Sequence, residues 1–441
     1  MSRHWCALGL AALLSALSGC GGGGNDAPPD CAFHAGAFAE ETLPQNAPRG
    51  ADIPVNHIVV LMQENRSFDS YFGQLPAAGH PGVDGLPADA FNPDTKGVPQ
   101  PAFHQVKYCT EDTNHAWTGS HLEFHDGQND GFVTQNDPNG ARAMGFYDES
   151  DLPFYYAMAK TFAIGDRYFC SLLGPTFPNR FYLMTGTSFG HIRNDMQQGG
   201  FPQRSMFDLL DENQITWMVY YNDFPFASLL DIQNGPQFAR FPKFLADAAA
   251  GTLPQVTFVD PAVGLTGVET DEHPPANIQQ GERFAAQVVQ AVMQSPNWPT
   301  TALFLAYDEH GGFYDHVAPP AACAPDDIAP MEDPKDPDSD YPGLFNRYGF
   351  RVPVVVVSPF AKPGFVSHAV YDHTSILRFI ETRFHLPALT DRDANASPML
   401  DMFDFSHPAL LDPLLLPAVT VDPERLQQCK ADFPGKNFGT R

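Results

Sequence analysis

Five segments of the chain are apolar without interruption, and none of them alternates polar with apolar positions. Such runs predict strands that are covered on both faces, as in a parallel sheet. They span residues 57–62, 216–221, 255–259, 301–307 and 352–357.

The segments between these runs carry apolar residues at helical spacing. One apolar stripe predicts a helix over 281–295, a second predicts a helix over 374–384, and a third helix is expected over 205–212. Strands that alternate with helices indicate an α/β fold, with a mostly parallel central sheet and helices on both faces. The first stripe is Phe284, Ala285, Val288, Val289, Val292 and Met293, and the second is Ile376, Leu377, Ile380 and Phe384.

Residues 73–151 and 323–348 resist this pattern because they are rich in Pro, Asp and Gly. We expect them to be ordered loops over one core, where ligand-facing residues are often found. The chain has 42 prolines in 441 residues, which argues against a helical bundle or solenoid. The expected organisation is a signal peptide over 1–19, a tether over 20–50 and one folded domain over 51–441.

The balance of charge narrows the range of partners. There are 25 Lys and Arg against 52 Asp and Glu, a formal net charge of −27, which argues against a nucleic-acid-binding protein. With 43% hydrophobic residues, the chain is not a disordered acidic tail.

The first twenty residues have the pattern of an export signal. Arg3 is followed by a short apolar stretch, which is too short for a permanent membrane span. Residues 17–20 (LSGC) resemble the lipobox of bacterial lipoproteins, which implies a lipid anchor at Cys20; the alternative is an ordinary secretory signal. In the lipoproteins that this segment resembles, the residue after the lipidated cysteine directs sorting, and here it is Gly21 and not Asp. We therefore expect the protein to be anchored at the periplasmic face of the outer membrane, with secretion as the alternative.

Of the seven cysteines, Cys6 would be removed with the signal peptide and Cys20 would carry the lipid, so five remain in the folded domain and its tether. An exported chain permits disulfides, and an odd number leaves one thiol free. We expect Cys170 to be the free, buried thiol because it lies in an apolar run. Three pairings of the remaining four stay open: these are Cys31, Cys109, Cys323 and Cys429.

Oxygen-bearing side chains follow two of the predicted strands. Glu64 and Asn65 come after the first, and Asp308 and Glu309 come after the fourth. Ligands of open α/β sheets bind beyond the carboxyl ends of the strands. We therefore expect these residues to form an all-oxygen cluster that suits a hard divalent cation.

Two hydroxyls compete as nucleophiles. Thr176 follows Gly174 and Pro175 at the expected start of a helix. Ser188 lies in GTSFG (186–190), which matches the nucleophile elbow of serine esterases; that motif requires a strand before the serine and a helix after it.

Taken together, these segments resemble the bacterial phosphoesterase family of phospholipases C and acid phosphatases, within the alkaline-phosphatase-like superfamily. The similar stretches are NHIVVLMQENRSFDSYFG (56–73), NHAW (114–117), DGF (130–132), GPTFPNR (174–180), DEHPP (271–275), YDEHGGFYDHV (307–317) and HTS (373–375).

The resemblance implies an alkaline-phosphatase-like fold and a role for each matching residue. Thr176 would be the nucleophile, passing through a phosphothreonine intermediate, and His115 and His273 would face the phosphoryl group. A divalent metal, whether Ca, Mg, Mn or Zn, would be held by Glu64, Asn65, Thr176, Asp308 and Glu309.

Several alternatives stay open at this stage. The substrate is either a phospholipid headgroup ester or a phosphomonoester; larger relatives carry C-terminal β-rich modules that this chain lacks, which weakens the case for phosphatidylcholine. Competing functions are a serine carboxylesterase using Ser188 and a non-catalytic, anion-binding envelope lipoprotein. The oligomeric state, the roles of His310, His316 and His373, and a choline contact by Trp117, Trp217 or Tyr221 are undecided.

Overall fold

The computed structural model describes residues 31–196, 201, 203–230, 237–333, 335, 339–412 and 415–439. The expected signal peptide and the tether as far as residue 30, Cys20 included, lie outside these residues. No helix in the described ranges is long and apolar enough to cross a membrane.

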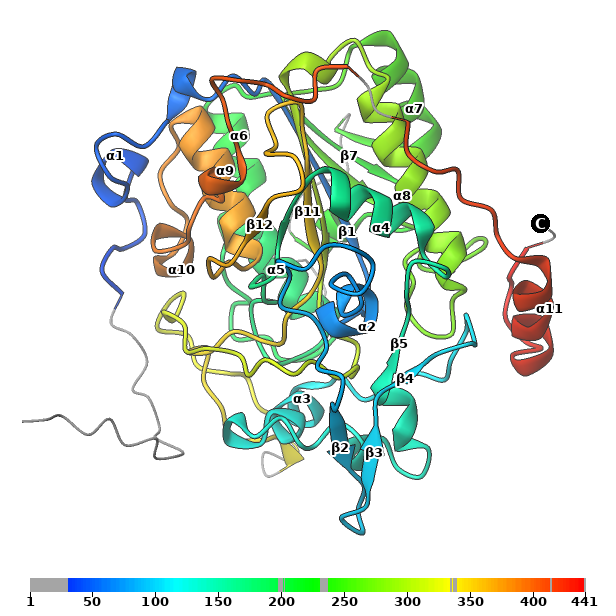
Figure 1. Cartoon of the computed structure of the whole chain (residues 1–441). Coiled ribbons are helices and arrows are strands. Elements are labelled where there is room, and N and C mark those ends of the chain that lie inside the picture. The colour runs from blue at the N-terminus through cyan, green and yellow to red at the C-terminus, as the bar shows by residue number, and fades with distance from the viewer. Residues whose placement is uncertain are drawn as a thin grey trace, which may run out of the picture.

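A central sheet runs through the described part of the chain in the order β12-β6-β11-β10-β1-β9-β7-β8 (Figure 1). β1 pairs in parallel with both β10 and β9. The strands are β1 (His57–Gln63), β6 (Ala163–Gly165), β7 (Trp217–Tyr221), β8 (Phe238–Arg240), β9 (Val256–Asp260), β10 (Thr301–Tyr307), β11 (Val354–Val357) and β12 (Val366–Ser367). Two small two-stranded sheets comprise β2 (Phe91–Pro93), β3 (Pro99–Pro101), β4 (Phe103–His104) and β5 (Gly145–Phe146).

All five apolar runs form strands of this sheet, and the prediction of a mostly parallel α/β fold is confirmed. The direction expected for the last run is wrong, because β11 is antiparallel to both β10 and β6. A strand that is buried on both faces is apolar whichever way it runs, so hydrophobicity alone does not reveal its direction.

Helices cover both faces of the sheet (Figure 1). On one face lie α4 (Pro153–Thr161), α7 (Phe241–Ala250) and α8 (Ile278–Met293); on the other lie α5 (Thr176–Thr185), α6 (Met206–Glu212), α9 (His373–Phe384) and α10 (Asp391–Ala394). The three predicted helices correspond to α8, α9 and α6. Outside these layers are α1 (Ala39–Thr42), α2 (Phe68–Phe72), α3 (Trp117–Phe124) and α11 (Pro423–Asp432).

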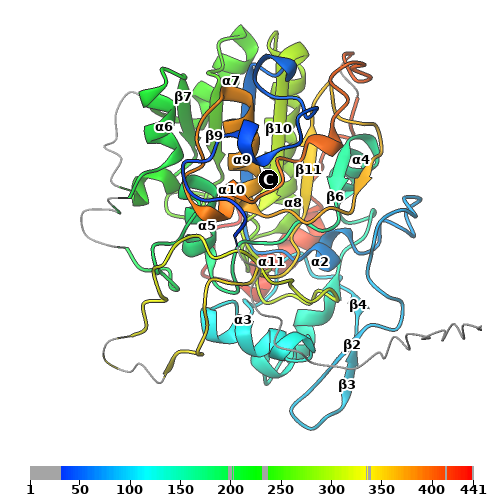
Figure 2. The same ribbon diagram turned by 90° about the vertical axis from the view of Figure 1, so that its left-hand side faces the viewer.

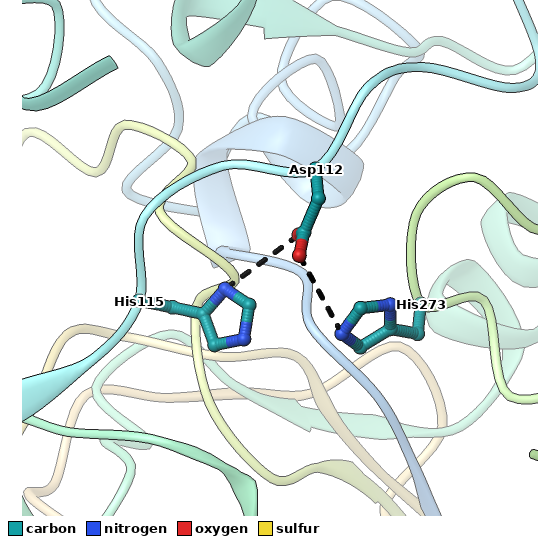
Figure 3. A group of neighbouring side chains, drawn as sticks. All are labelled: Asp112, His115 and His273. Carbon is teal, nitrogen blue, oxygen red and sulfur yellow. Dashed lines mark ion pairs between the residues drawn. The ribbon is translucent and has the colours of Figure 1, made fainter.

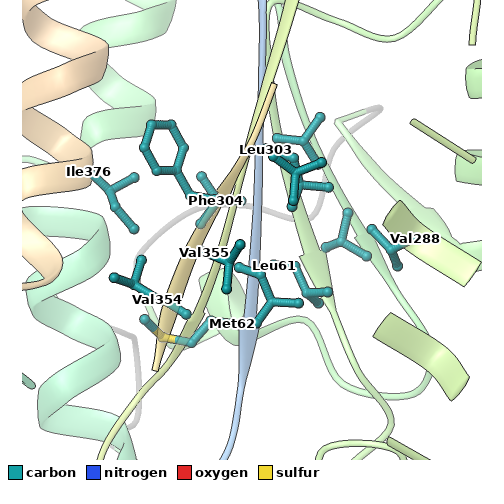
Figure 4. Packing of buried hydrophobic residues seen from close by; sticks show 14 of the residues in the cluster. Leu61, Met62, Val288, Leu303, Phe304, Val354, Val355 and Ile376 are labelled. Carbon is teal, nitrogen blue, oxygen red and sulfur yellow. The ribbon is translucent and has the colours of Figure 1, made fainter. Parts of the chain in front are cut away.

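The core lies between the strands and these helices. The side chain of Phe304 in β10 points to the same side of the sheet as Ile376 of α9, and Val288 of α8 lies on the other side (Figure 4). The ring of Phe304 packs edge-on against Phe379, with 5.0 Å between centroids. Because both faces are dry, the polar groups at the ends of the strands are the part of the sheet available for chemistry.

Two disulfides join distant parts of the chain. Cys31 is bonded to Cys323, and Cys109 is bonded to Cys429. Cys170 is free and buried, as predicted. The second bridge ties α11 to the long segment before α3, and both views place that segment, with β2, β3, β4 and α3, at one end of the molecule (Figures 1 and 2).

Candidate active site

The segments that follow β1 and β10 leave the sheet side by side. Gln63 pairs with Tyr307 in the register of the two strands, so the next residues of each strand are neighbours. The backbone N–H of Asn65 donates to Asp308 Oδ1 at 3.1 Å, and Glu64, Asn65, Asp308 and Glu309 are all buried. Parallel pairing therefore gathers the oxygen-bearing side chains at the carboxyl edge.

A buried guanidinium lies among these carboxylates. Arg180 donates to Glu64 Oε1 at 3.1 Å and to Asp308 Oδ2 at 3.2 Å, and its Nη1 is 4.0 Å from Asp260. Burial raises the pKa of Asp308 to about 6 and that of Asp260 to about 6, while Arg180 opposes both shifts. The site thus holds more carboxylates than this one arginine neutralises.

Thr176 enters the site as the first residue of α5. The turn before it is held by Asn179, whose Oδ1 accepts from Leu172 N at 3.1 Å and whose Nδ2 donates to Gly174 O at 2.9 Å. Thr176 is buried, and Arg180 follows it by one helical turn on the same face. The helix that presents the hydroxyl therefore also carries the arginine that contacts Glu64 and Asp308.

Two imidazoles and a carboxylate lie beside this cluster (Figure 3). His115 comes from the segment before α3 and His273 from the segment between β9 and α8, and their rings meet edge-on at 5.5 Å. Asp112 lies 3.7 Å from His115 Nδ1 and 4.0 Å from His273 Nε2. His115 Nδ1 donates to Thr113 O at 2.7 Å, so its Nε2 presents a lone pair to Asn65 Nδ2 at 3.2 Å.

The buried oxygens of this cluster fit a metal ion. Asn65 Oδ1 and Glu309 Oε1 are both buried and have no hydrogen-bond partner among the described residues. His115 Nε2 lies 3.2 Å from Asn65 Nδ2 and 3.9 Å from Glu309 Oε1, so the two orphaned oxygens belong to side chains that adjoin one imidazole. Buried oxygen atoms left without a donor suit a hard cation. Asp112, His115 and His273 form a further group whose ligand atoms lie close enough to hold a metal.

Three further histidines lie next to the site. His373 Nε2 donates to the backbone oxygen of Asp308 at 2.7 Å, and burial lowers the pKa of His373 to about 3. His310 pairs with buried Glu123 at 2.8 Å, and His316 pairs with Asp69 at 2.7 Å. The bonds of these three side chains hold the segment that follows β10.

Sequence reasoning missed Arg180, Asp112 and Asp260. Arg180 is four residues after Thr176, and Asp260 ends an apolar run, so both carried a local signal. Asp112 carried none, because it meets His273 only through the fold.

The structure contradicts the serine-esterase alternative. Ser188 follows a helix rather than a strand, is fully buried, and has an Oγ without a hydrogen-bond partner in the described part of the chain. The proposed choline contacts are also occupied elsewhere. Trp117 is buried and donates Nε1 to Tyr341 O at 2.9 Å. Trp217 is buried against Phe207, and Tyr221 lies under the Arg240 guanidinium.

An α/β sheet whose carboxyl edge gathers carboxylates, histidines and a helix-borne hydroxyl has the parts expected of a phosphoric ester hydrolase. The Phosphoesterase family profile matches residues 55–387, and the chain belongs to this family. The protein is an enzyme that hydrolyses phosphoric esters.

Its relatives include phospholipases C. Phospholipase C B of Mycobacterium tuberculosis is 34% identical over 80% of this chain and 78% of that protein. Non-specific phospholipase C6 of Arabidopsis thaliana is 32% identical over 87% of this chain and 79% of that protein. Among solved structures, lipoteichoic acid synthase LtaP from Listeria monocytogenes is 8% identical with a TM-score of 0.42, covering 81% of this chain and 78% of that chain.

Proposed function

We propose that the protein is a metal-dependent phospholipase C that cleaves the headgroup ester of a phospholipid through a phosphothreonine intermediate on Thr176. The observation that carries the proposal is the pair of orphaned oxygens, Asn65 Oδ1 and Glu309 Oε1, within the carboxylate cluster. The relatives named phospholipase C favour a phospholipid over a phosphomonoester.

One divalent cation would be held by Glu64, Asn65, Thr176, Asp308 and Glu309. When bound, it would lower the pKa of the threonine hydroxyl and neutralise charge on the phosphoryl oxygens. An all-oxygen ligand set favours Ca, Mg or Mn over Zn.

The protein's own groups carry the rest of the reaction. The Thr176 oxygen attacks phosphorus as the alkoxide, so an O–P bond forms while the bond from phosphorus to the leaving alcohol breaks. In the imidazolium form of His273, Nδ1 donates to Pro274 O at 2.6 Å, and the Nε2–H gives its proton to the departing alkoxide. Water then gives a proton to the neutral imidazole and attacks the phosphothreonine, and the P–O bond to Thr176 breaks with the Thr176 alkoxide as the leaving group. His115 holds Asn65 in place and faces the same phosphoryl group.

The location of the enzyme is part of the proposal. A lipid anchor at Cys20 would place it at the periplasmic face of the outer membrane, next to phospholipid; secretion is the alternative. The catalytic unit would comprise residues 51–441, which contain the whole family match.

The test compares para-nitrophenyl phosphorylcholine with para-nitrophenyl phosphate, before and after metal removal by a chelator. We expect faster cleavage of the choline diester, loss of activity with the chelator and recovery with added cation. Thr176→Ala should abolish turnover, and Ser188→Ala serves as the matched control. Faster cleavage of the monoester would make the enzyme a phosphatase, and an active Thr176→Ala would remove the phosphothreonine.

A further inference from the structure

We propose that Glu272, a buried carboxylate outside the ligand set, is the positioning residue that aims the His273 imidazole at the reacting phosphate. The inference rests on the role of His273 in the proposed function and extends it to a residue that does not touch substrate.

The Glu272 carboxylate is held by three donors from three elements of the core. Tyr155 of α4 donates its hydroxyl to Oε1 at 2.6 Å, and Tyr307 of β10 donates to Oε2 at 2.8 Å. Gln63 of β1 donates Nε2 to Oε1 at 3.2 Å. The side chain is fully buried, and a buried carboxylate is stable only where donors of this kind replace water. The anchor therefore ties residue 272 to the rigid sheet and to α4.

The backbone at this position is strained and is tied to the metal-binding segment. Glu272 has a φ of 77°, in the left-handed region that a residue with a side chain rarely occupies. Its carbonyl accepts from Arg66 Nη2 at 2.7 Å, and the carbonyl of Asp271 accepts from Glu64 N at 2.8 Å. The residue before His273 is thus fixed relative to the segment that carries Glu64 and Asn65.

The neighbouring helix leaves space for the anchor. A Cβ at Gly281 of α8 would lie 2.0 Å from Glu272 Cγ. Only glycine fits at position 281, because any side chain there would occupy the space that the Glu272 side chain needs to reach the tyrosines.

These contacts serve the position of one imidazole. His273 is half-buried at the edge of the site, and its own bond from Nδ1 to Pro274 O fixes only the ring's rotation. The His273 backbone makes two local bonds, from its N–H to Asp271 Oδ1 at 3.2 Å and from Ala276 N to its carbonyl at 2.7 Å, and Glu272 is the adjacent residue that ties this loop to the sheet. A displacement of about 1 Å at a catalytic group costs roughly 100-fold in rate, so loosening the anchor should lower kcat more than substrate binding.

The experiment removes one donor hydroxyl, because removing the carboxylate would leave three donors unpaired in the core. Tyr155→Phe deletes the shortest bond to Glu272. Tyr156→Phe is the matched control: Tyr156 is the next residue of α4, is equally buried, and donates to Tyr147 O at 3.0 Å instead. Both variants are made in the full-length enzyme and again in a His273→Ala background, with kcat and KM measured on para-nitrophenyl phosphorylcholine.

We expect Tyr155→Phe to lower kcat by about 10- to 100-fold with KM changed by less than about 3-fold, and Tyr156→Phe to leave kcat within about 2-fold. The effect of Tyr155→Phe should vanish in the His273→Ala background. Equal losses in the two phenylalanine variants, or an undiminished loss without His273, would overturn the inference. If His273→Ala alone kept the wild-type kcat, the assignment of His273 itself would fail, which is a separate result.

Discussion

Asn65 and His115 form a hydrogen bond that fixes the orientation of the Asn65 amide. Asn65 Nδ2 donates to His115 Nε2 at 3.2 Å, which leaves Asn65 Oδ1 without a partner among the described residues. The imidazole can accept this bond because its other nitrogen donates to Thr113 O. A histidine from one loop therefore decides which end of an amide from another faces the proposed cation.

Removing this histidine should weaken the metal site. In His115→Ala the amide of Asn65 is free to rotate, and we expect cation affinity to fall about 10- to 100-fold, the usual effect of losing such a supporting contact. Titration calorimetry with Mn, Mg and Ca measures it on binding alone. His121→Ala is the control, since His121 bonds to Trp117 O and not to the cluster. Unchanged affinity in His115→Ala would disprove the orienting role.

Arg180 should be coupled to the metal through stability. Arg180→Met leaves Glu64 and Asp308 buried and unpaired, so we expect a loss of about 3–5 kcal/mol in the free energy of unfolding without metal. A bound divalent cation should recover part of the loss, because it supplies the missing positive charge. Urea unfolding with and without saturating Mn measures both effects. A loss that is the same in both conditions would contradict the coupling.

Glu282 should make stability depend on pH. It accepts from the N–H groups of Phe154 and Tyr155 at the start of α4, and burial raises its pKa to about 8. In the unfolded chain this carboxyl ionises near pH 4.5. Between these pH values the folded protein holds a proton on Glu282 that the unfolded chain has lost. The free energy of unfolding is therefore unaffected by Glu282 below pH 4.5 and falls as the pH rises towards 8.

Glu282→Gln removes this titration and keeps an oxygen acceptor for α4. We expect the variant to gain stability over the wild type as pH rises from 4.5 to 8, by at most about 5 kcal/mol. Urea unfolding at several pH values measures the difference. The control is Glu149→Gln, at an exposed glutamate that pairs with Lys160 of α4, and it should show no such trend. A difference between Glu282→Gln and wild type that stays constant with pH would refute the prediction.

The bridge between Cys109 and Cys429 should stabilise the long segment that leads to Asp112 and His115. The double variant Cys109→Ala and Cys429→Ala should lose about 2–5 kcal/mol in the free energy of unfolding. Cys170→Ala, which removes a thiol outside both bridges, is the control. Reductant should lower its stability by as much as it lowers that of the wild type. Thermal unfolding with and without reductant provides the measurement. Equal stability of the double variant and the wild type would show that the bridge is not a constraint.

The sequence by itself determined the strands and the chemistry at their ends. Short apolar runs between helical segments favour interior strands, and acidic residues placed directly after such strands lie at the edge of the sheet. This local logic located Glu64, Asn65, Asp308 and Glu309. It also identified Cys170 as the free thiol, since that cysteine lies within an apolar run.

Only the tertiary structure decided which distant groups meet. Three features depend on how the loops return to the sheet, which residue spacing does not reveal. They are the direction of β11, the pairing of the four bridged cysteines and the approach of Asp112 to His273. The anchoring of Glu272 by tyrosines from α4 and β10 belongs to the same class. Periodicity reports the burial of each residue, whereas a site assembled from several loops is set by the packing of the whole domain.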